Sequence, residues 1–173
     1  MIPLAVANDR SRRLCEILLP FCKSLQVVGS IRRQKPEVKD IDLLCIFRPR
    51  GAVDLLGWFK DNRHAKYAPG TQESMPQLIS AGAAKMAMVF ETTAVDLWFA
   101  TEETWGVLGL IRTGSADHNK KLCILAKNQG WHFAVGGAHP GIYDQNGKKL
   151  AGDTEAEFFR VLGIDYVPPH RRG

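Results

Sequence analysis

Two short apolar runs that carry acidic residues constrain this chain more than any other feature. The first contains Asp40 and Asp42 in the pattern D-x-D, and the second contains Asp96 as its only charged residue. Side chains two apart on a strand point to the same face, so Asp40 and Asp42 project together while Ile41 and Leu43 anchor the other face. A lone carboxylate in an apolar strand is costly to bury. We therefore expect two adjoining strands that bring these carboxylates to one site.

A group of carboxylates of this kind points to a metal ion. Closely spaced carboxylates repel each other and stay ionised only where cations lie beside them. Hard oxygen ligands with no cysteine or histidine nearby favour Mg²⁺ or Mn²⁺ over zinc. The alternative is ordinary surface acidity at a strand end for Asp40 and Asp42, and a solvent-facing edge position for Asp96. The D-x-D pattern alone does not separate the two interpretations.

Helix-like and strand-like patterns follow each other along the chain, which predicts an α+β fold with a mixed sheet. Apolar spacing predicts an amphipathic helix over residues 7–21, with Asn8 or Asp9 as its N-cap. Strand patterns occur at residues 25–28, 41–47, 85–90 and 94–99, the last two forming an antiparallel hairpin. Helices are expected at 53–59, at 116–128 and after the capping box of Thr154 and Glu157, with a hairpin-like segment at 133–150 and a loop at 67–76.

The charge of the chain suggests a polyanionic partner. The net charge is +5 and the calculated pI is about 9.1. Basic residues gather in four places, which are Arg10/Arg12/Arg13, Arg32/Arg33/Lys35/Lys39, Lys120/Lys121/Lys127 and Arg171/Arg172. Such patches suit a phosphate backbone if the fold brings them to one surface, and the alternative is several solvated faces.

The cysteines and the apolar runs bear on location. Cys15, Cys22, Cys45 and Cys123 stand singly, so we interpret them as reduced thiols. No apolar run approaches the roughly 20 residues that a membrane span requires, and the first residues lack the pattern of a signal peptide. We expect a protein that is cytoplasmic or associated with the nucleoid, and not secreted.

A possible phosphate site precedes the D-x-D pattern. Gly29 and Ser30 stand at an expected strand-to-helix turn, where backbone N–H groups and a hydroxyl can bind a phosphate. Arg33 can neutralise further charge with two parallel hydrogen bonds. A triphosphate cradle just before a carboxylate pair is the layout that nucleotidyl transfer with two metal ions requires.

These motifs resemble those of a known family. Val28-Gly29-Ser30-Ile31-Arg32-Arg33 followed by Asp40-Ile41-Asp42 is similar to the signature of the polymerase beta nucleotidyltransferase superfamily. Thr113-Gly114-Ser115, with His118-Asn119 opening a basic helix, resembles the thumb of family X DNA polymerases, as does the end of the chain from Gly141 to Pro169. The resemblance implies a polymerase beta-like palm at residues 1–105 and a small helix-and-hairpin thumb at 106–173.

The resemblance also implies roles for individual residues. Asp40, Asp42 and Asp96 would bind two Mg²⁺ ions, for which Mn²⁺ can substitute, and Asp96 would receive the proton of the primer 3′-hydroxyl. The implied nucleotide-binding residues are Gly29, Ser30, Arg33, Gly114, Ser115 and Asn119, with Ser30 and Arg33 at the β- and γ-phosphates and Asn119 at the minor-groove edge of the base. The implied DNA-binding residues are Lys120, Lys121 and Lys127. Without the resemblance, Ser115 is interpreted as an N-cap and Asn119 as an exposed helix residue.

The chain departs from the family pattern in three ways. We expect no counterpart of the family's lyase and fingers regions in this sequence. Ile111-Arg112 stands where the family has an aromatic pair, so we expect weaker exclusion of ribonucleotides. Cys123 stands where an arginine often occurs, which puts accurate checking of the new base pair in doubt.

The expected function is that of a DNA-directed DNA polymerase. It would add deoxynucleotides to a primer 3′-hydroxyl, fill short gaps in DNA repair and act as a monomer on primer-template or gapped DNA with a dNTP. The alternative enzyme is a template-independent nucleotidyltransferase that acts on a nucleic-acid end or a small acceptor. A third interpretation is a binding module without catalysis, against which the complete set of aspartates argues.

Overall fold

The computed structural model describes residues 1–62, 75–136 and 139–173, which form two compact units. We call the first the sheet unit, made of Met1–Val27 and Pro36–Phe99, and the second the helical unit, made of Val28–Lys35 and Ala100–Gly173. The predicted palm at 1–105 and thumb at 106–173 are divisions by function and stay predictions. Most of the loop expected at 67–76 lies outside the described residues.

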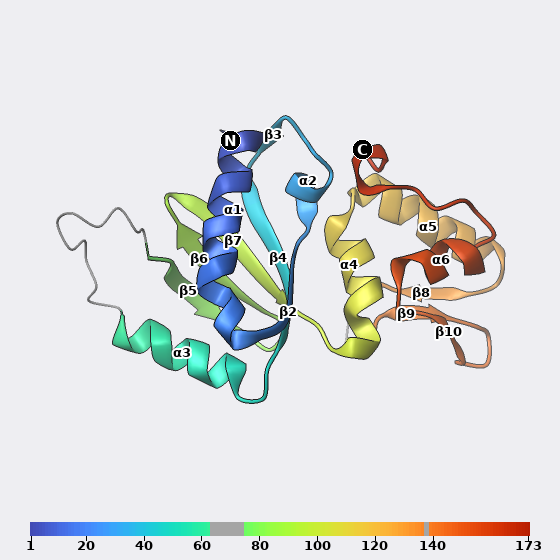
Figure 1. Ribbon diagram of the computed structural model, residues 1–173. Helices are drawn as coiled ribbons and strands as arrows, with labels where there is room; N and C mark the ends of the chain where they lie inside the picture. The colour runs from blue at the N-terminus through green and yellow to red at the C-terminus, as the bar shows by residue number, and fades with distance from the viewer. Residues whose placement is uncertain (63–74, 137–138) are drawn as a thin grey trace. The chain divides into compact units, whose positions relative to one another are not determined.

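A mixed sheet forms the sheet unit (Figure 1). Across the sheet the strands run in the order β2 (Cys22–Val27), β4 (Asp40–Phe47), β7 (Thr93–Phe99), β6 (Lys85–Phe90) and β5 (Gln77–Ala81). The β4–β7 pair is parallel and the other pairs are antiparallel. Buried residues alternate with more exposed ones along β6 and β7. One face of the sheet buries Ile41, Leu43, Val95, Leu97, Met86 and Met88. The predicted hairpin of 85–90 and 94–99 is confirmed.

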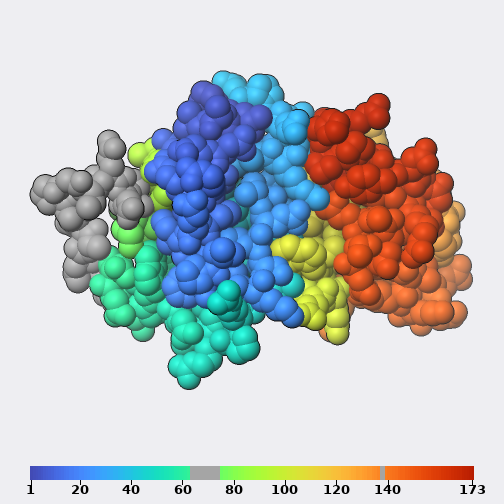
Figure 2. Space-filling model, viewed as in Figure 1, coloured from blue at the N-terminus to red at the C-terminus, as the bar shows by residue number. Residues whose placement is uncertain are grey.

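Helix α1 (Leu4–Leu18) lies over the sheet and forms much of the surface of this unit in the space-filling view (Figure 2). Its buried side is made of Ala7, Ser11, Leu14 and Leu18, which are three or four residues apart and therefore lie one per helical turn. A short 3₁₀ turn, Leu19–Phe21, completes the predicted helical stretch.

The start of α1 corrects a prediction. The helix begins at Leu4 with Pro3 as its N-cap, and not at Asn8 or Asp9. Strand β1 (Ile2–Pro3) pairs with β3 (Glu37–Val38), and the N–H of Leu4 donates to the carbonyl of Pro36 over 3.0 Å. This tertiary pairing fixes the chain ahead of the helix, so no side-chain cap is needed there.

Helix α3 (Gly51–Asp61) extends the predicted helix at 53–59 at both ends. It buries Leu55 and Phe59. Its first residue, Gly51, lies so close to the carbonyl oxygen of Phe21 that a Cβ atom would overlap it. The glycine therefore sets how closely α3 approaches the turn after α1.

The helical unit contains four α-helices among the described residues, together with a small antiparallel sheet. The helices are α2 (Gly29–Arg32), α4 (Trp105–Thr113), α5 (Ala116–Asn128) and α6 (Glu155–Val161). The sheet has the order β10 (Lys149–Ala151), β9 (Gly141–Tyr143) and β8 (His132–Ala134). Two short 3₁₀ turns, Glu102–Thr104 and Pro169–Arg171, complete the unit.

Buried apolar side chains from every larger element meet in one core of the helical unit. The core is made of Val107, Leu110, Leu122, Ala126, Phe133, Ile142, Ala151, Phe158, Phe159 and Leu162. The starts of α5 and α6 carry the caps that the sequence indicates. Thr154 and Glu157 form the predicted capping box, and α5 spans the predicted residues 116–128.

Candidate active site

The sheet places the predicted carboxylates on one face of two neighbouring strands. In the parallel pairing of β4 with β7, Asp42 stands opposite Asp96 and Asp40 stands opposite Ala94. All three aspartates are partly exposed, whereas Ile41 and Val95 beside them are buried on the other face. Residues opposite each other in a parallel pair share a face, and so do residues two apart. The backbone therefore directs Asp40, Asp42 and Asp96 to the same side of the sheet.

Neighbouring side chains hold two of these carboxylates. The ammonium group of Lys85, on β6, lies 2.8 Å from each of the two oxygens of Asp96. The indole N–H of Trp98 donates to Oδ1 of Asp42 over 3.3 Å. The same indole ring lies under the Lys85 ammonium, 4.8 Å from the ring centroid. Lys85 and Trp98 were not among the predicted site residues, although Trp98 follows Asp96 by two and therefore shares its face.

The donor chemistry of this face fits Mg²⁺ or Mn²⁺, since its ligands would be carboxylate oxygens. The present side-chain positions do not close a metal cage. Within residues 1–62, 75–136 and 139–173, no group of three or more His, Cys, Asp or Glu side chains is close enough to hold a metal ion. A cation at Asp96 would bind one or both of the oxygens that Lys85 now contacts.

The predicted phosphate-binding turn belongs to the helical unit. Gly29 has a φ of +64°, and α2 follows as a single turn that ends at Arg33. The hydroxyl oxygen of Ser30 is shielded from solvent and has no hydrogen-bond partner among the described residues. A buried hydroxyl without a hydrogen-bond partner is costly, and a bound group that accepted a hydrogen bond from it would remove that cost.

The fold brings two of the predicted nucleotide-binding elements together. The guanidinium of Arg33 donates to the carbonyl of Thr113, and it lies next to Gly114, where a Cβ atom would be 3.1 Å from Nη1. Gly114 has a φ of +70°, which favours glycine. The turn of Gly29 to Arg33 and the turn at Gly114 are thus neighbours within one unit, which their sequence separation does not reveal.

Ser115 is the N-cap that the sequence indicates, whereas Asn119 is partly buried and not an exposed helix residue. Ser115 caps α5, since its hydroxyl accepts from the N–H of His118 over 3.3 Å. The side-chain amide of Asn119 donates to the carbonyl of Ile111 over 2.9 Å, while its amide oxygen is buried and has no partner in the described part of the chain. Ile111 itself packs against the core of the helical unit. The predicted contacts of Ser115 and Asn119 with a nucleotide stay predictions.

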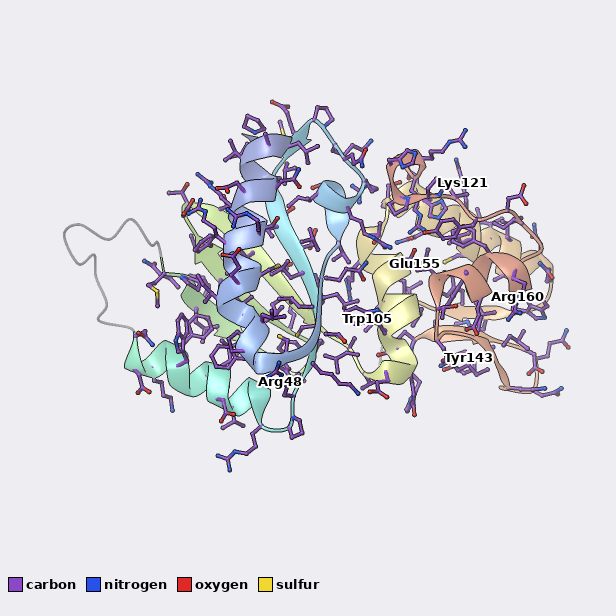
Figure 3. All side chains as sticks on the ribbon, in the orientation of Figure 1. Arg48, Trp105, Lys121, Tyr143, Glu155 and Arg160 are labelled. Carbon is purple, nitrogen blue, oxygen red and sulfur yellow. The ribbon has the colours of Figure 1, made fainter. Side chains whose placement is uncertain are left out.

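The structure contains an ion cluster around Glu155 that the sequence patterns do not indicate. Glu155, labelled in Figure 3, accepts from Arg32 and, over 2.8 Å, from Arg172. Tyr166 donates to the same carboxylate over 3.3 Å. The Arg172 side chain is fully buried and lies over the rings of Phe159 and Tyr166.

The electrostatics of this cluster favour an ionised carboxylate. Burial acts to raise the pKa of Glu155, but the hydrogen bonds and charges of Arg32 and Arg172 outweigh it and lower that pKa. Arg32 also donates to the hydroxyl of Thr113 over 2.6 Å. Arg32 therefore ties the turn that carries Ser30 and Arg33 to α4 and α6.

Arginines from several of the basic clusters in the sequence form ion pairs with glutamates. Arg10 and Arg13 of α1 both contact Glu91, and Arg32 and Arg172 contact Glu155. These arginines therefore do not form an open phosphate-binding surface. The residues next to these arginines in the sequence do not indicate that each has an acidic partner far along the chain.

The lysines of α5 remain available to solvent. Lys120, Lys121 and Lys127 are all exposed, while Leu122 and Ala126 of the same helix are buried. Lys121 is labelled on α5 in Figure 3. Lys120 pairs with Asp117 over 3.2 Å. The helix thus presents a basic outer side, as a DNA-binding role requires.

Comparisons with known proteins agree with this architecture. Residues 109–173 match the DNA polymerase beta thumb family. The chain is 27% identical over 178 residues to the DNA polymerase/3'-5' exonuclease PolX of Bacillus subtilis (strain 168), an alignment that covers 98% of this chain. It spans only 28% of the length of that relative.

A solved structure gives the fold. The chain superposes on Leishmania infantum polymerase beta, from the crystal structure of its ternary P/T complex, with a TM-score of 0.72 and 19% identity, covering 99% of this chain and 76% of the other. The fold is therefore that of polymerase beta, a mixed sheet with helices, and the predicted fold class is confirmed. The predicted resemblance is confirmed as well: residues 109–173 match the DNA polymerase beta thumb, and nearly the whole chain is similar to PolX of Bacillus subtilis.

One further finding concerns membranes. None of the helices in the described parts of the chain has both the length and the apolar character needed to cross a bilayer.

Proposed function

We propose that this chain is a nucleotidyltransferase that adds deoxynucleotides to the 3′ end of a DNA primer. The observation that carries the proposal is the placement of Asp42 opposite Asp96 on parallel strands, with Asp40 on the same face. The match of residues 109–173 to the polymerase beta thumb supports it, as does the similarity to PolX.

Asp40, Asp42 and Asp96 would hold two Mg²⁺ ions, which when bound polarise the attacking and leaving oxygens of the transfer. Asp96 would receive the proton of the primer 3′-hydroxyl, because a carboxylate at hydrogen-bond distance is a suitable acceptor. This role requires that the carboxylate be released from Lys85.

Phosphate binding is assigned to the turn of the helical unit. Ser30 would donate its hydroxyl hydrogen, which has no acceptor within the described residues, to a phosphate oxygen. Arg33 would neutralise further charge on the β- and γ-phosphates. Gly114 and Ser115 would lie beside the sugar and Asn119 beside the base. Lys120, Lys121 and Lys127 would bind the DNA backbone, and a monomer would suffice for short-gap filling in repair.

The test is nucleotide incorporation by two single variants. We expect Asp42→Asn and Asp96→Asn each to abolish primer extension with Mg²⁺, since loss of a metal ligand or proton acceptor removes several kcal/mol of transition-state stabilisation. Asp61→Asn, at an exposed position at the end of α3, is the matched control and should extend the primer normally. Thermal unfolding of all three proteins checks that the fold is intact. Near-normal turnover by either site variant would contradict the assignment.

The choice of substrate separates the polymerase from the alternative transferase. Extension on templated and gapped DNA, with the base chosen by the template, is expected. Extension of single-stranded ends without regard to a template would instead support the template-independent enzyme.

A further inference from the structure

Lys85 has an unusual position for a residue beside three acidic groups that are proposed to bind metal. Its ammonium group contacts both oxygens of Asp96 at 2.8 Å. Lys85 stands opposite Trp98 in the β6–β7 pairing, and Asp96 stands opposite Ala87. The contact is therefore a diagonal one across two neighbouring strands, on the face that carries the aspartates.

The ammonium group and a divalent cation need the same oxygens. Both oxygens of Asp96 are engaged by Lys85, so a cation that coordinates either of them must displace at least part of this contact. Two positive charges beside one carboxylate also repel each other. Binding of the cation and pairing of Lys85 with Asp96 are thus mutually exclusive or strongly opposed.

Trp98 gives the displaced lysine a second partner. The Lys85 ammonium lies 4.8 Å from the centroid of the indole ring, a distance at which a cation–π attraction operates. The side chain of Lys85 is 39% exposed, so it can also turn into solvent. The same indole donates to Asp42, which keeps the ring in place beside both carboxylates. Lys85 can therefore leave Asp96 without losing all of its interactions.

We propose that Lys85 is a built-in counter-cation of Asp96, which a divalent metal ion must displace, and that it thereby sets the metal affinity of the site. The inference rests on the proposed function, because it takes Asp96 as a metal ligand. It adds a positioning residue outside the three aspartates: in the absence of metal, Lys85 holds the Asp96 carboxylate and neutralises it.

Direct binding of Mn²⁺ tests the inference without DNA or nucleotide. Free Mn²⁺ is measured by its electron paramagnetic resonance signal during titration of wild type, Lys85→Met and Lys85→Arg. Lys85→Met removes the charge and keeps the side-chain length, so we expect its Kd for Mn²⁺ to fall about three- to fivefold, the range that a partly exposed ion pair supports. Lys85→Arg keeps the competing charge and should bind Mn²⁺ no more tightly than wild type.

The control variant is Lys60→Met, at an exposed position on α3 of the same unit. It changes the net charge by the same amount and should leave the Kd at the wild-type value. Thermal unfolding of each variant checks the fold, and Lys85→Gln replaces Lys85→Met if the latter is unstable. A Kd for Lys85→Met or Lys85→Gln that equals or exceeds that of wild type, or that falls no further than in Lys60→Met, would overturn the inference.

Failure of the inference differs from failure of the proposed function. If Asp96→Asn weakens Mn²⁺ binding but Lys85→Met does not strengthen it, Asp96 is a ligand and Lys85 is not its competitor. If Asp96→Asn binds Mn²⁺ as wild type does, the metal assignment of the proposed function fails and the inference fails with it.

Discussion

Helix α4 approaches the loop before α6 so closely at Gly106 that a Cβ atom there would lie 2.5 Å from the carbonyl carbon of Asp153 and would also overlap the Cα atom of Thr154. The N–H of the next residue, Val107, donates to the carbonyl of Gly152 over 3.0 Å. The contact is between backbones, which cannot move aside as a flexible side chain can. Gly106 therefore fixes the packing of α4 against the segment that leads into α6.

Two glycine-to-alanine substitutions in helices should have opposite effects. Gly106→Ala should lower the free energy of unfolding by about 1–3 kcal/mol, because the added methyl group forces the backbones apart. Gly57→Ala, in α3, should raise it by about 0.5–1 kcal/mol, since nothing lies within 4 Å of the added atom and alanine favours the helix. Denaturant unfolding measures both. A stabilising Gly106→Ala would contradict the close approach described for α4.

The carboxylate of Glu155 should be a major contributor to the stability of the helical unit. Glu155→Gln leaves the fully buried guanidinium of Arg172 without its counter-charge, and we expect a loss of about 2–4 kcal/mol in the free energy of unfolding. Asp165→Asn, at an exposed position in the same unit, should change it by less than about 0.5 kcal/mol.

A second substitution checks the cause of that loss. Adding Arg172→Met to Glu155→Gln should recover about 1 kcal/mol or more, because the uncompensated charge is then removed. If the double variant is less stable than Glu155→Gln by the full cost of a lost arginine contact, the charge imbalance is not the source of the effect.

Stability should depend on pH through His118. Burial, together with the positive charges of Arg172 and Lys121, lowers the pKa of His118 from 6.5 to about 4. Between these values the unfolded chain takes up a proton that the folded chain does not, so stability falls as the pH falls through this window. We expect the loss between pH 7 and pH 5 to be about 1–2 kcal/mol larger in wild type than in His118→Phe.

The variant keeps the aromatic contact, because the His118 ring stacks on Phe159 at 5.9 Å between centroids. Unfolding in urea at several pH values gives the comparison. Glu155 acts mainly at lower pH: its pKa is lowered, so its contribution is present above the usual carboxyl range and is lost as the pH falls through the lowered value. Equal slopes for wild type and His118→Phe between pH 7 and pH 5 would show that His118 titrates normally.

DNA binding should depend strongly on salt through α5. Replacing Lys121 and Lys127 with alanine should reduce the slope of log K against log salt by roughly one unit for each lost phosphate contact. Lys120 is left in place because it already pairs with Asp117. The control replaces two exposed lysines of the sheet unit, Lys23 and Lys60, and should alter the slope less. The same slope in the α5 variant and in wild type would place this helix away from the DNA.

Local patterns in the sequence were sufficient for the elements that carry the candidate site. The period-two alternation around Asp40, Asp42 and Asp96 places the three on one face of neighbouring strands, as the β4–β7 register confirms. Ser115 as the N-cap of α5 and the Thr154–Glu157 capping box are likewise found. The two caps and the shared face of Asp40 and Asp42 depend on residues within a few positions of each other, so their physical causes are present in the sequence itself. The pairing of β4 with β7, by contrast, joins residues far apart in the chain.

Helix α4 shows where local reasoning stops. Its nine residues include Gly106 and Gly109, which lower helix propensity, and the sequence did not indicate a helix there. The helix forms because Val107 and Leu110 enter the core of the helical unit and because glycine permits the approach to Asp153. Tertiary packing therefore outweighs propensity at this position.

The amino-acid sequence establishes which residues carry a charge, but the tertiary fold controls which of these charges come into contact. Arg32 and Arg172 belong to basic clusters in the sequence, yet both pair with Glu155, which is far from Arg32 in the chain. Lys85 likewise has no acidic neighbour in its own strand, and the β6–β7 pairing brings its ammonium group into contact with Asp96. A charge finds its partner through space, and the distance between two charges depends on strand register and helix packing, which no short stretch of sequence specifies.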